Sequence, residues 1–474
     1  MSNKKLIDFY ELTMAYTDMK NGKLNERCYF DVYFRKNLDN GGYNISCGID
    51  DIVGYIKDLK FEEEDIEYLR TLNKFDEEFL EYLRDFKFKG DIYAIPDGTP
   101  IFPNEPCITV YGTTMEAQMI ETDLLNKFNH GCLIATKAKR IVNEAKGKPV
   151  MEFGARRAQG GDAAMNGAKF AYIAGVAGTS CYETGRRFRI PLLGTMAHSH
   201  IMKYKTEYDS FLAYAKSFPE DSTFLVDTID TLKSGVPNAI KVAKDYLIPN
   251  GYKLKGIRLD SGDLGYLSKE ARKMLDSEGL DYVKICVSNS LDERVIKELL
   301  AQGAPIDSFG VGENLITSRS TPVFGGVYKL VAMESKGKVI PKIKISENVE
   351  KITNPGYKRV YRFYDKATGY ALGDVIANYD EIIPEDTYTL VDEKDPWKKK
   401  TITNYTVREL QIPIFRKGEL VYNVPTLEER REYCENEMAT LYPEIKRLDN
   451  PHKYIVDLSV KMQEIKKDLL FNTK

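Results

Sequence analysis

The sequence predicts an α/β protein in which an irregular (β/α) barrel lies between an N-terminal and a C-terminal segment that together form an α+β domain. Apolar strand-like runs in the middle of the chain alternate with helical patterns, and such alternation is typical of a parallel sheet. Polar residues follow each run, as they do at the carboxyl ends of barrel strands. An open doubly wound sheet would instead bind its ligand at one switch point.

Length and composition limit the alternatives. A chain of 474 residues is too long for one ordinary core, so we place domain boundaries at 1–130, 131–335 and 336–474. The net charge of −3 argues against general binding of nucleic acid. No apolar run approaches the roughly 20 residues that cross a bilayer, and no signal peptide is evident. Seven cysteines without a Cys-x-x-Cys pair indicate reduced thiols. We therefore expect a cytoplasmic protein without a membrane partner.

The N-terminal segment contains helical and strand-like patterns in alternation. We expect a helix within 1–22 that begins near Asp8, a strand at 27–34, helices across 49–86, short antiparallel strands within 90–112, and helices at about 114–129 and 135–146.

The barrel segment carries the apolar runs, and the later runs recur every 24 to 33 residues. Strands are expected at 149–153, 190–194, 223–227, 255–259, 282–287 and 306–311, with helices that include 264–278 and 291–302. This rhythm fades after about residue 335. Beyond it we expect strands at 338–345, 357–364 and 387–391, a loop at 396–400, and helices at 426–442 and 451–470.

The densest group of charges lies just after the run at 255–259. Arg258, Asp260, Ser261 and Asp263 lie within six residues, together with a glycine. A cation for phosphate, carboxylates for ribose hydroxyls or Mg²⁺, and a glycine for close backbone approach suit a sugar-phosphate site. A helix cap at Asp260 or Ser261 is the alternative, but it accounts for only one of these residues.

Two histidines follow the run at 190–194. Between hydroxyls and just past a strand end, His198 could be a general base, a nucleophile or a phosphate acceptor. A structural histidine in the barrel mouth is the alternative. In an extended strand His200 would point to the same side as His198, so spacing alone does not choose between them.

Other strand ends offer groups for a ring and for phosphate. Phe153 beside Arg156 suits a planar anionic ring, although a core phenylalanine followed by a solvated basic turn would give the same sequence pattern. Late barrel loops commonly bind phosphate, and two segments are candidates for it. One is the glycine loop of Gly310, Gly312 and Glu313. The other is Ser288 with Asn289, for which the alternative is an ordinary turn with a helix cap at Asn289 or Ser290.

Five motifs in order across nearly the whole chain resemble the nicotinate phosphoribosyltransferase family. They lie at 8–14, 152–160, 194–199, 258–264 and 325–330. The resemblance implies a type II phosphoribosyltransferase barrel that condenses nicotinate with phosphoribosyl pyrophosphate (PRPP), giving nicotinate mononucleotide and pyrophosphate. It also implies coupling to ATP hydrolysis through a phosphohistidine, with Mg²⁺ as cofactor.

The resemblance carries specific roles onto this chain. It places the phosphorylated histidine at His198, a phosphate-binding role at Arg258, and ribose or Mg²⁺ binding at Asp260 and Asp263. Phe153 would stack on the pyridine ring. Tyr10 matches a second aromatic that comes from the neighbouring subunit, which implies a homodimer with shared active sites. Thr195 and Arg156 match residues of the substrate pocket, and Asp227 matches a carboxylate at the barrel mouth.

Two positions bear on specificity. Ser180 lies where the related nicotinamide phosphoribosyltransferases carry an aspartate, and a hydroxyl can donate to nicotinate whereas a carboxylate would repel it. Glu313 replaces a threonine of some members, and an acid near phosphate must bind through Mg²⁺ or turn away. Nicotinamide as substrate and a non-catalytic barrel that binds a sugar phosphate are the alternatives. An isomerase or aldolase would need a lysine or glutamate at a strand end, and no lysine stands out there.

Overall fold

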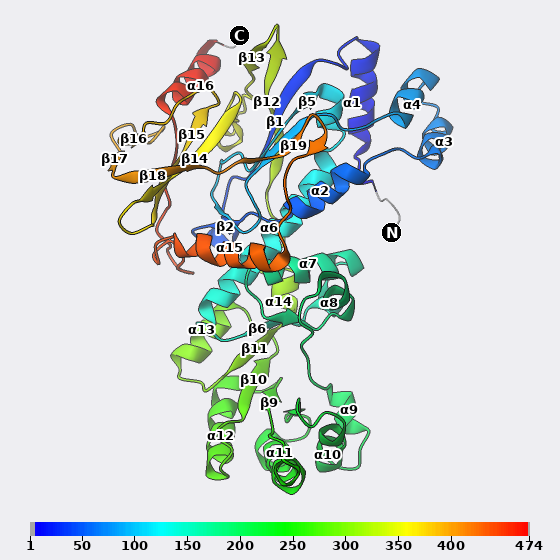
Figure 1. Cartoon of the computed structure of the whole chain (residues 1–474), viewed down its shortest axis with the longest axis vertical. Helices are drawn as coiled ribbons and strands as arrows, with labels where there is room; N and C mark the ends of the chain where they lie inside the picture. The colour runs from blue at the N-terminus through cyan, green and yellow to red at the C-terminus, as the bar shows by residue number, and fades with distance from the viewer. Residues whose placement is uncertain (1–4, 473–474) are drawn as a thin grey trace. The chain divides into compact units, whose positions relative to one another are not determined.

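The computed structural model describes residues 5–472, and the chain divides into two compact units (Figure 1). The barrel unit comprises residues 134–322. The split unit comprises the described residues up to 133 together with those from 323 onward, so both ends of the chain contribute to it.

The barrel unit is built on a six-stranded sheet whose strands all run parallel, in the order β7-β6-β11-β10-β9-β8. The strands are β6 (Val150–Glu152), β7 (Gly178–Thr179), β8 (Thr223–Leu225), β9 (Gly256–Leu259), β10 (Lys284–Ser288) and β11 (Ser308–Val311). Because the last strand, β11, pairs with the first, β6, the sheet curls as a barrel does. The predicted irregular (β/α) barrel is confirmed.

One edge of this sheet explains the irregularity. Beyond β7 the chain adds only a single parallel bridge, between Thr179 and Leu192. The strand expected at 190–194 is therefore wrong as a full strand, and the two-residue β7 was not expected because so short a run leaves no apolar pattern. Among the described residues no pairing joins this edge to β8, so the ring is open there.

Helices follow the strands as the alternation predicts (Figure 1). The expected helices at 264–278 and 291–302 are confirmed as α12 (Leu264–Ser277) and α13 (Glu293–Ala301). The remaining α-helices within this unit are α7 (Gly161–Ile173), α8 (Tyr182–Phe188), α9 (His198–Met202), α10 (Glu207–Ser217), α11 (Val236–Val242) and α14 (Glu313–Ile316).

The two helices expected at 114–129 and 135–146 are instead a short α5 (Thr114–Gln118) and one long α6 (Glu121–Glu144). Gly131 lies within α6. It allows close packing, since a Cβ there would lie 2.3 Å from the carbonyl oxygen of Cys47.

The split unit contains a seven-stranded sheet in the order β13-β12-β1-β5-β3-β19-β20. Its strands are β1 (Arg27–Tyr33), β3 (Asp91–Ala94), β5 (Ile108–Thr113), β12 (Val327–Ser335), β13 (Lys338–Pro341), β19 (Ile412–Arg416) and β20 (Glu419–Leu420). β1 pairs with β12 on one side and β5 on the other. Residues 323–335, which the sequence boundaries placed with the barrel, belong to this unit because β12 pairs with β1.

A second sheet of the split unit has the order β18-β14-β15-β21. It consists of β14 (Lys358–Asp365), β15 (Ala371–Asn378), β18 (Tyr405–Glu409) and β21 (Val456–Leu458), and β16 (Thr387–Val391) pairs separately with β17 (Lys399–Thr403). The helix expected at 451–470 is wrong in its first part, which holds β21 before α16 (Val460–Asn472) begins. The last two residues of the loop expected at 396–400 belong to β17 instead.

The split unit also contains helices, and a short β2 (Asn44–Ile45) pairs with β4 (Pro100–Ile101). The helices are α1 (Phe9–Lys20), α2 (Ile49–Asp58), α3 (Glu63–Thr71), α4 (Glu77–Arg84) and α15 (Leu427–Ala439). The N-cap of α1 is Asp8, where the sequence predicted the helix to begin. Within the described residues, no helix combines the length and apolarity that a membrane span requires.

Candidate active site

Arg258, on β9, is the centre of the polar group at the carboxyl ends of the barrel strands. Its Nε donates to Ser288 Oγ at 2.9 Å, its Nη1 to Thr195 Oγ1 at 3.1 Å, and its Nη2 to Asp260 Oδ1 at 3.1 Å. The guanidinium carbon lies 5.4 Å from the centre of the Phe153 ring. The side chain is 14% exposed. Two of its three partners are neutral hydroxyls, so much of its charge is available to an anion.

Asp227 holds the turn that follows β9. Its Oδ2 accepts from the backbone N–H of Asp260 at 2.8 Å and from Ser261 Oγ at 2.6 Å. The other oxygen, Oδ1, is buried and has no hydrogen-bond partner among the described residues. Asp260 in turn accepts from Ser288 through its Oδ1. The predicted Asp227, Asp260 and Ser288 are therefore brought together with Arg258.

His198 is the first residue of α9, and its ring nitrogens face two different partners. Nδ1 lies 3.0 Å from Thr228 Oγ1, and Nε2 lies 3.6 Å from Asp260 Oδ2. The side chain is 39% exposed. From the sequence Thr228 has no predicted role of its own, although it directly follows Asp227 at a strand end. The histidine thus adjoins the Arg258 group and is open to solvent.

His200 has a different environment. Its ring centre lies 5.2 Å from that of Tyr204 and 6.1 Å from that of Tyr214. An extended strand would have placed both histidines on one side, but the segment begins a helix, in which residues two apart do not share a face. Geometry therefore separates His198, near Asp260, from His200, which packs on tyrosine rings.

A cavity of about 400 Å³, the ring cavity, opens beside Arg258. It is lined by Phe153, Ala155, Arg156, Ser180, Leu193, Gly194, Thr195, Met196, Ala197 and Arg258. The predicted ring-binding residues Phe153, Arg156 and Ser180 thus line one space, together with Thr195. Its apolar, cationic and hydroxyl groups suit a small planar anion.

Gly310 and Gly312 have a role that the sequence did not reveal. A Cβ at Gly310, within β11, would lie 2.4 Å from the Phe153 ring, and one at Gly312 would lie 3.2 Å from the Phe153 carbonyl oxygen. The first distance is too short for any side chain, so Gly310 makes the space that the Phe153 ring fills.

Glu313 turns toward two arginines. Its Oε2 lies 3.8 Å from Arg157 Nε, and its Oε1 lies 3.3 Å from Arg319 Nη1. The ion pairs are exposed to solvent, so each contributes little stability. They do account for how an acid is accommodated beside the glycine loop.

The turn after β10 has an unusual backbone. Asn289 and Ser290 have φ angles of 85° and 53°, in the left-handed region that non-glycine residues rarely occupy. Asn314 Nδ2 supports the turn by donating to the carbonyl oxygens of Ser290 and Leu291 at 3.1 Å each. An ordinary cap at Asn289 or Ser290 is excluded, because Asp292 caps α13. Such strained turns are common at functional sites.

Asp263 differs from Asp260 in its contacts. Its side chain accepts from the backbone N–H of Tyr266 at 2.9 Å and so caps α12. The sequence offered Asp260 or Ser261 as the alternative cap, which is wrong. Of the two aspartates predicted for ribose or metal, Asp260 faces Arg258, and Asp263 faces the helix.

Tyr10 belongs to the split unit, on α1. Burial and the nearby Glu121 carboxylate raise the pKa of its hydroxyl to about 12, yet 44% of the residue remains exposed. Leu6, Phe9 and Met14 are also exposed. Tyr10 therefore lies on a stretch of chain with several exposed apolar side chains.

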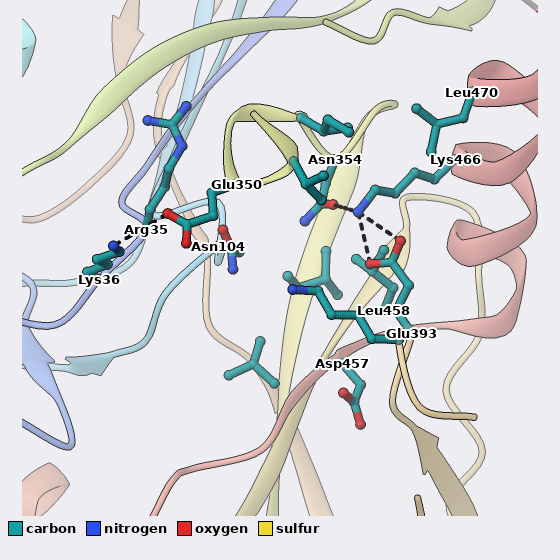
Figure 2. A pocket seen from close by; sticks show the side chains of 15 residues that line it. Arg35, Lys36, Asn104, Glu350, Asn354, Glu393, Asp457, Leu458, Lys466 and Leu470 are labelled. Atoms are coloured by element: carbon teal, nitrogen blue, oxygen red, sulfur yellow. Dashed lines mark hydrogen bonds and ion pairs between the residues drawn. The ribbon is translucent and has the colours of Figure 1, made fainter. Parts of the chain in front are cut away.

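Figure 2 shows a second cavity, of about 420 Å³, within the split unit. Lys466 Nζ bonds Glu393 at 2.8 Å and Asn354 at 3.0 Å, and Lys36 lies 3.4 Å from Glu350. Lys466 and Lys36 in this cavity are thus each paired with a carboxylate, whereas two of the three partners of Arg258 are hydroxyls.

The fold and the site together define a class. Parallel barrel strands bring a cation, carboxylates, hydroxyls and a cavity to one edge, which is where barrel enzymes carry their active sites. Three family models match the chain: the N-terminal domain of nicotinate phosphoribosyltransferase (NAPRTase) at 6–129, the NAPRTase family at 149–376, and its C-terminal domain at 357–466. The chain belongs to the nicotinate phosphoribosyltransferase family.

Individual proteins of this family are also similar to the chain over nearly its whole length. The nicotinate phosphoribosyltransferase of Bacillus subtilis (strain 168) is 43% identical over 95% of this chain and 92% of its own length. The Homo sapiens enzyme is 29% identical over 97% of this chain and 95% of its own. The crystal structure of human nicotinic acid phosphoribosyltransferase superposes with a TM-score of 0.87, at 27% identity, and covers 98% of this chain and all of that one.

Proposed function

We propose that this protein is a nicotinate phosphoribosyltransferase of NAD biosynthesis, which transfers the phosphoribosyl group of PRPP to the ring nitrogen of nicotinate and releases pyrophosphate. The observation that carries the proposal is the position of Arg258. It adjoins both Asp260, which suits the ribose, and the ring cavity. Family membership supports the same reaction.

Charge develops on both fragments as the bond between ribose and pyrophosphate breaks. The leaving pyrophosphate gains negative charge, which Arg258 is placed to stabilise. The ribose gains positive charge, and Asp260 lies beside Arg258 at 3.1 Å. Phe153 holds the pyridine ring in line with the ribose carbon, which is an orientation effect.

Mg²⁺ fits the donors present. The buried Asp227 Oδ1 lacks a hydrogen-bond partner among the described residues, and Asp260 adds a second hard oxygen. No group of three or more potential ligands converges within the described chain, so an ion would take its other ligands from pyrophosphate and water. When bound, Mg²⁺ would neutralise charge on pyrophosphate. Asp263, the other predicted ligand, uses one oxygen as the α12 cap.

Nicotinate, an anion, suits the ring cavity better than nicotinamide does. Ser180 can donate a hydrogen bond to its carboxylate, and Arg156 lines the same cavity with a positive charge. Turnover of nicotinate against nicotinamide, with PRPP present and ATP varied, tests this. Preference for nicotinamide would contradict the Ser180 argument, and absence of any mononucleotide product would favour a non-catalytic barrel.

ATP is the proposed co-substrate, and His198 the residue that it phosphorylates. A phosphate there adds roughly two negative charges near Asp260 and Arg258, which could order the site for PRPP and Mg²⁺. His198→Ala should abolish stimulation by ATP and leave a slow transfer. ATP coupling that survives in this variant would refute the phosphohistidine.

A homodimer with shared active sites is the proposed assembly. Tyr10 and its neighbours Leu6, Phe9 and Met14 form an exposed apolar surface that a second subunit would cover. From that position Tyr10 of one subunit would stack on the ring bound by the other. Sedimentation of the wild type measures the assembly, and Tyr10→Ala should raise the KM for nicotinate.

A further inference from the structure

The end of β6 holds a fully buried carboxylate between two segments that line the ring cavity. Glu152 is 0% exposed and directly precedes Phe153. Its Oε1 accepts from the backbone N–H of Gly154, and its Oε2 accepts from Thr179 Oγ1 at 2.6 Å. One side chain therefore connects the turn after β6 to the end of β7.

The same connection continues toward Ser180. The Glu152 carbonyl oxygen accepts from the Ser180 backbone N–H at 2.9 Å, and Thr179 Oγ1 accepts from the Cys181 backbone N–H at 3.0 Å. Hydrogen bonds thus fix the backbone at Ser180 and at the next residue, Cys181. Since Thr179 is 1% exposed, water does not readily compete for its hydroxyl.

The backbone at Gly154, in the turn after β6, is closely packed and has no room for a side chain. A Cβ there would lie 2.6 Å from Ile316 Cβ and 2.8 Å from Glu152 Oε1. The chain therefore passes directly over the carboxylate, between it and α14. This tight turn sets the direction in which Phe153 leaves β6.

A buried carboxylate is a costly way to join two strands, because an ionised group loses its hydration. Burial raises the pKa of Glu152, and the Thr179 hydroxyl and the Gly154 amide oppose that rise. An apolar side chain in this position would avoid the cost but could not hold Gly154 and Thr179 at once. The carboxylate's two oxygens make it suited to that task.

We propose that Glu152 is a positioning residue, acting with Thr179, that fixes the distance and angle between Phe153 and Ser180 in the ring cavity. This inference rests on the proposed function, because it assigns Glu152 to the nicotinate side of the site. Arg258 and Asp260, on the PRPP side, are held by other contacts, from Ser288, Thr195 and Asp227. Loss of the Glu152 contacts should therefore affect one substrate and spare the other.

Thr179→Val is the sharpest variant, since it removes the hydroxyl and keeps the shape. The KM for nicotinate should rise at least about tenfold, because small displacements of positioning groups are costly, while the KM for PRPP changes less than about twofold. Thr179→Ser retains the hydroxyl and should restore the wild-type KM. Glu152→Gln, which keeps an acceptor for Gly154, should have an intermediate KM for nicotinate.

The double variant Glu152→Gln/Thr179→Val tests whether the two residues act together. Its KM for nicotinate should be no higher than that of the worse single variant, since both break one connection. An unchanged KM for nicotinate in Thr179→Val, or equal rises in the KM for both substrates, would overturn the proposal. A wild-type protein that forms no nicotinate mononucleotide would instead refute the proposed function, so the two failures are distinguishable.

Discussion

Two arginines, one in each unit, show what separates a structural charge from a functional one. Arg362, on β14 of the split unit, is 0% exposed and meets Asp374 in a bidentate pair, Nε to Oδ1 at 2.9 Å and Nη2 to Oδ2 at 2.7 Å. Arg258 is partly exposed and bonds two hydroxyls and one carboxylate beside the ring cavity. A matched, buried guanidinium holds the fold, whereas one placed among hydroxyls at a strand end can still meet an anion.

The surroundings of Arg362 strengthen the contrast. Tyr454 donates to Asp374 Oδ1 at 2.7 Å, and Glu105 lies 4.0 Å from Arg362. Burial and the neighbouring Asp374 raise the pKa of Glu105 well above its usual range. The four groups come from distant parts of the chain and join the N-terminal and C-terminal portions of the split unit.

Arg258→Ala should have the largest effect on activity. Loss of the cation should lower kcat/KM for PRPP by about a thousandfold, as loss of a transition-state donor does, with little change in Tm. Arg258→Lys should recover part of it, because lysine supplies a point charge without the planar fork. Steady-state kinetics with PRPP varied measures both variants. An unaffected kcat/KM in Arg258→Ala would remove Arg258 from the site.

Arg362→Ala should reverse the pattern, with loss of stability as its primary effect. Removal of one partner leaves Asp374 buried without its counter-charge, which costs about 3–5 kcal/mol of unfolding free energy. The matched double variant Arg362→Met/Asp374→Leu removes both charges and should cost much less. Urea unfolding compares them. A single variant as stable as the double one would show that the pair is not a buried charge pair of this kind.

The sequence predicts the barrel well where strands are long enough to leave a pattern. The runs at β9, β10 and β11 and their polar ends predict that Arg258 and Ser288 lie together, because the carboxyl ends of neighbouring parallel strands share one edge. The sequence-based prediction fails at β7, which has only two residues, and at α6. In α6, Gly131 is required because the backbone of Cys47, 84 residues earlier in the chain, passes close to it. Contacts between distant segments leave no local signal.

The site shows the same limit. Asp260 and Asp263 look equivalent in the sequence, and the backbone of the turn, with Gly262 at a φ of 75°, decides which one faces Arg258 and which one caps α12. Phe153 was predicted from its own motif, but the need for glycine at position 310 was not, because that need arises from a neighbouring strand.

Gly310→Ala should have a smaller effect than either arginine variant. The new Cβ would displace the Phe153 ring, so the KM for nicotinate should rise about tenfold, and overpacking should cost about 1–3 kcal/mol of stability. Gly54→Ala is a matched control, because a Cβ at Gly54 on α2 meets no atom within 4 Å. An unchanged KM for nicotinate in Gly310→Ala would show that the Phe153 ring can move without consequence.

The smallest expected effect concerns Asp263, and it decides what its carboxylate does besides capping. Asp263→Ala should cost about 1 kcal/mol through loss of the cap, whereas Asp263→Ser supplies another capping oxygen and should be nearly as stable as the wild type. Because Asp260, not Asp263, contacts Arg258, we expect Asp263→Ser to lower kcat/KM for PRPP only a few-fold and Asp260→Ser to lower it about a hundredfold. A stable Asp263→Ser variant that loses as much activity as Asp260→Ser would assign the second Asp263 oxygen to ribose or Mg²⁺. The cap would then be the means by which α12 orients a substrate ligand.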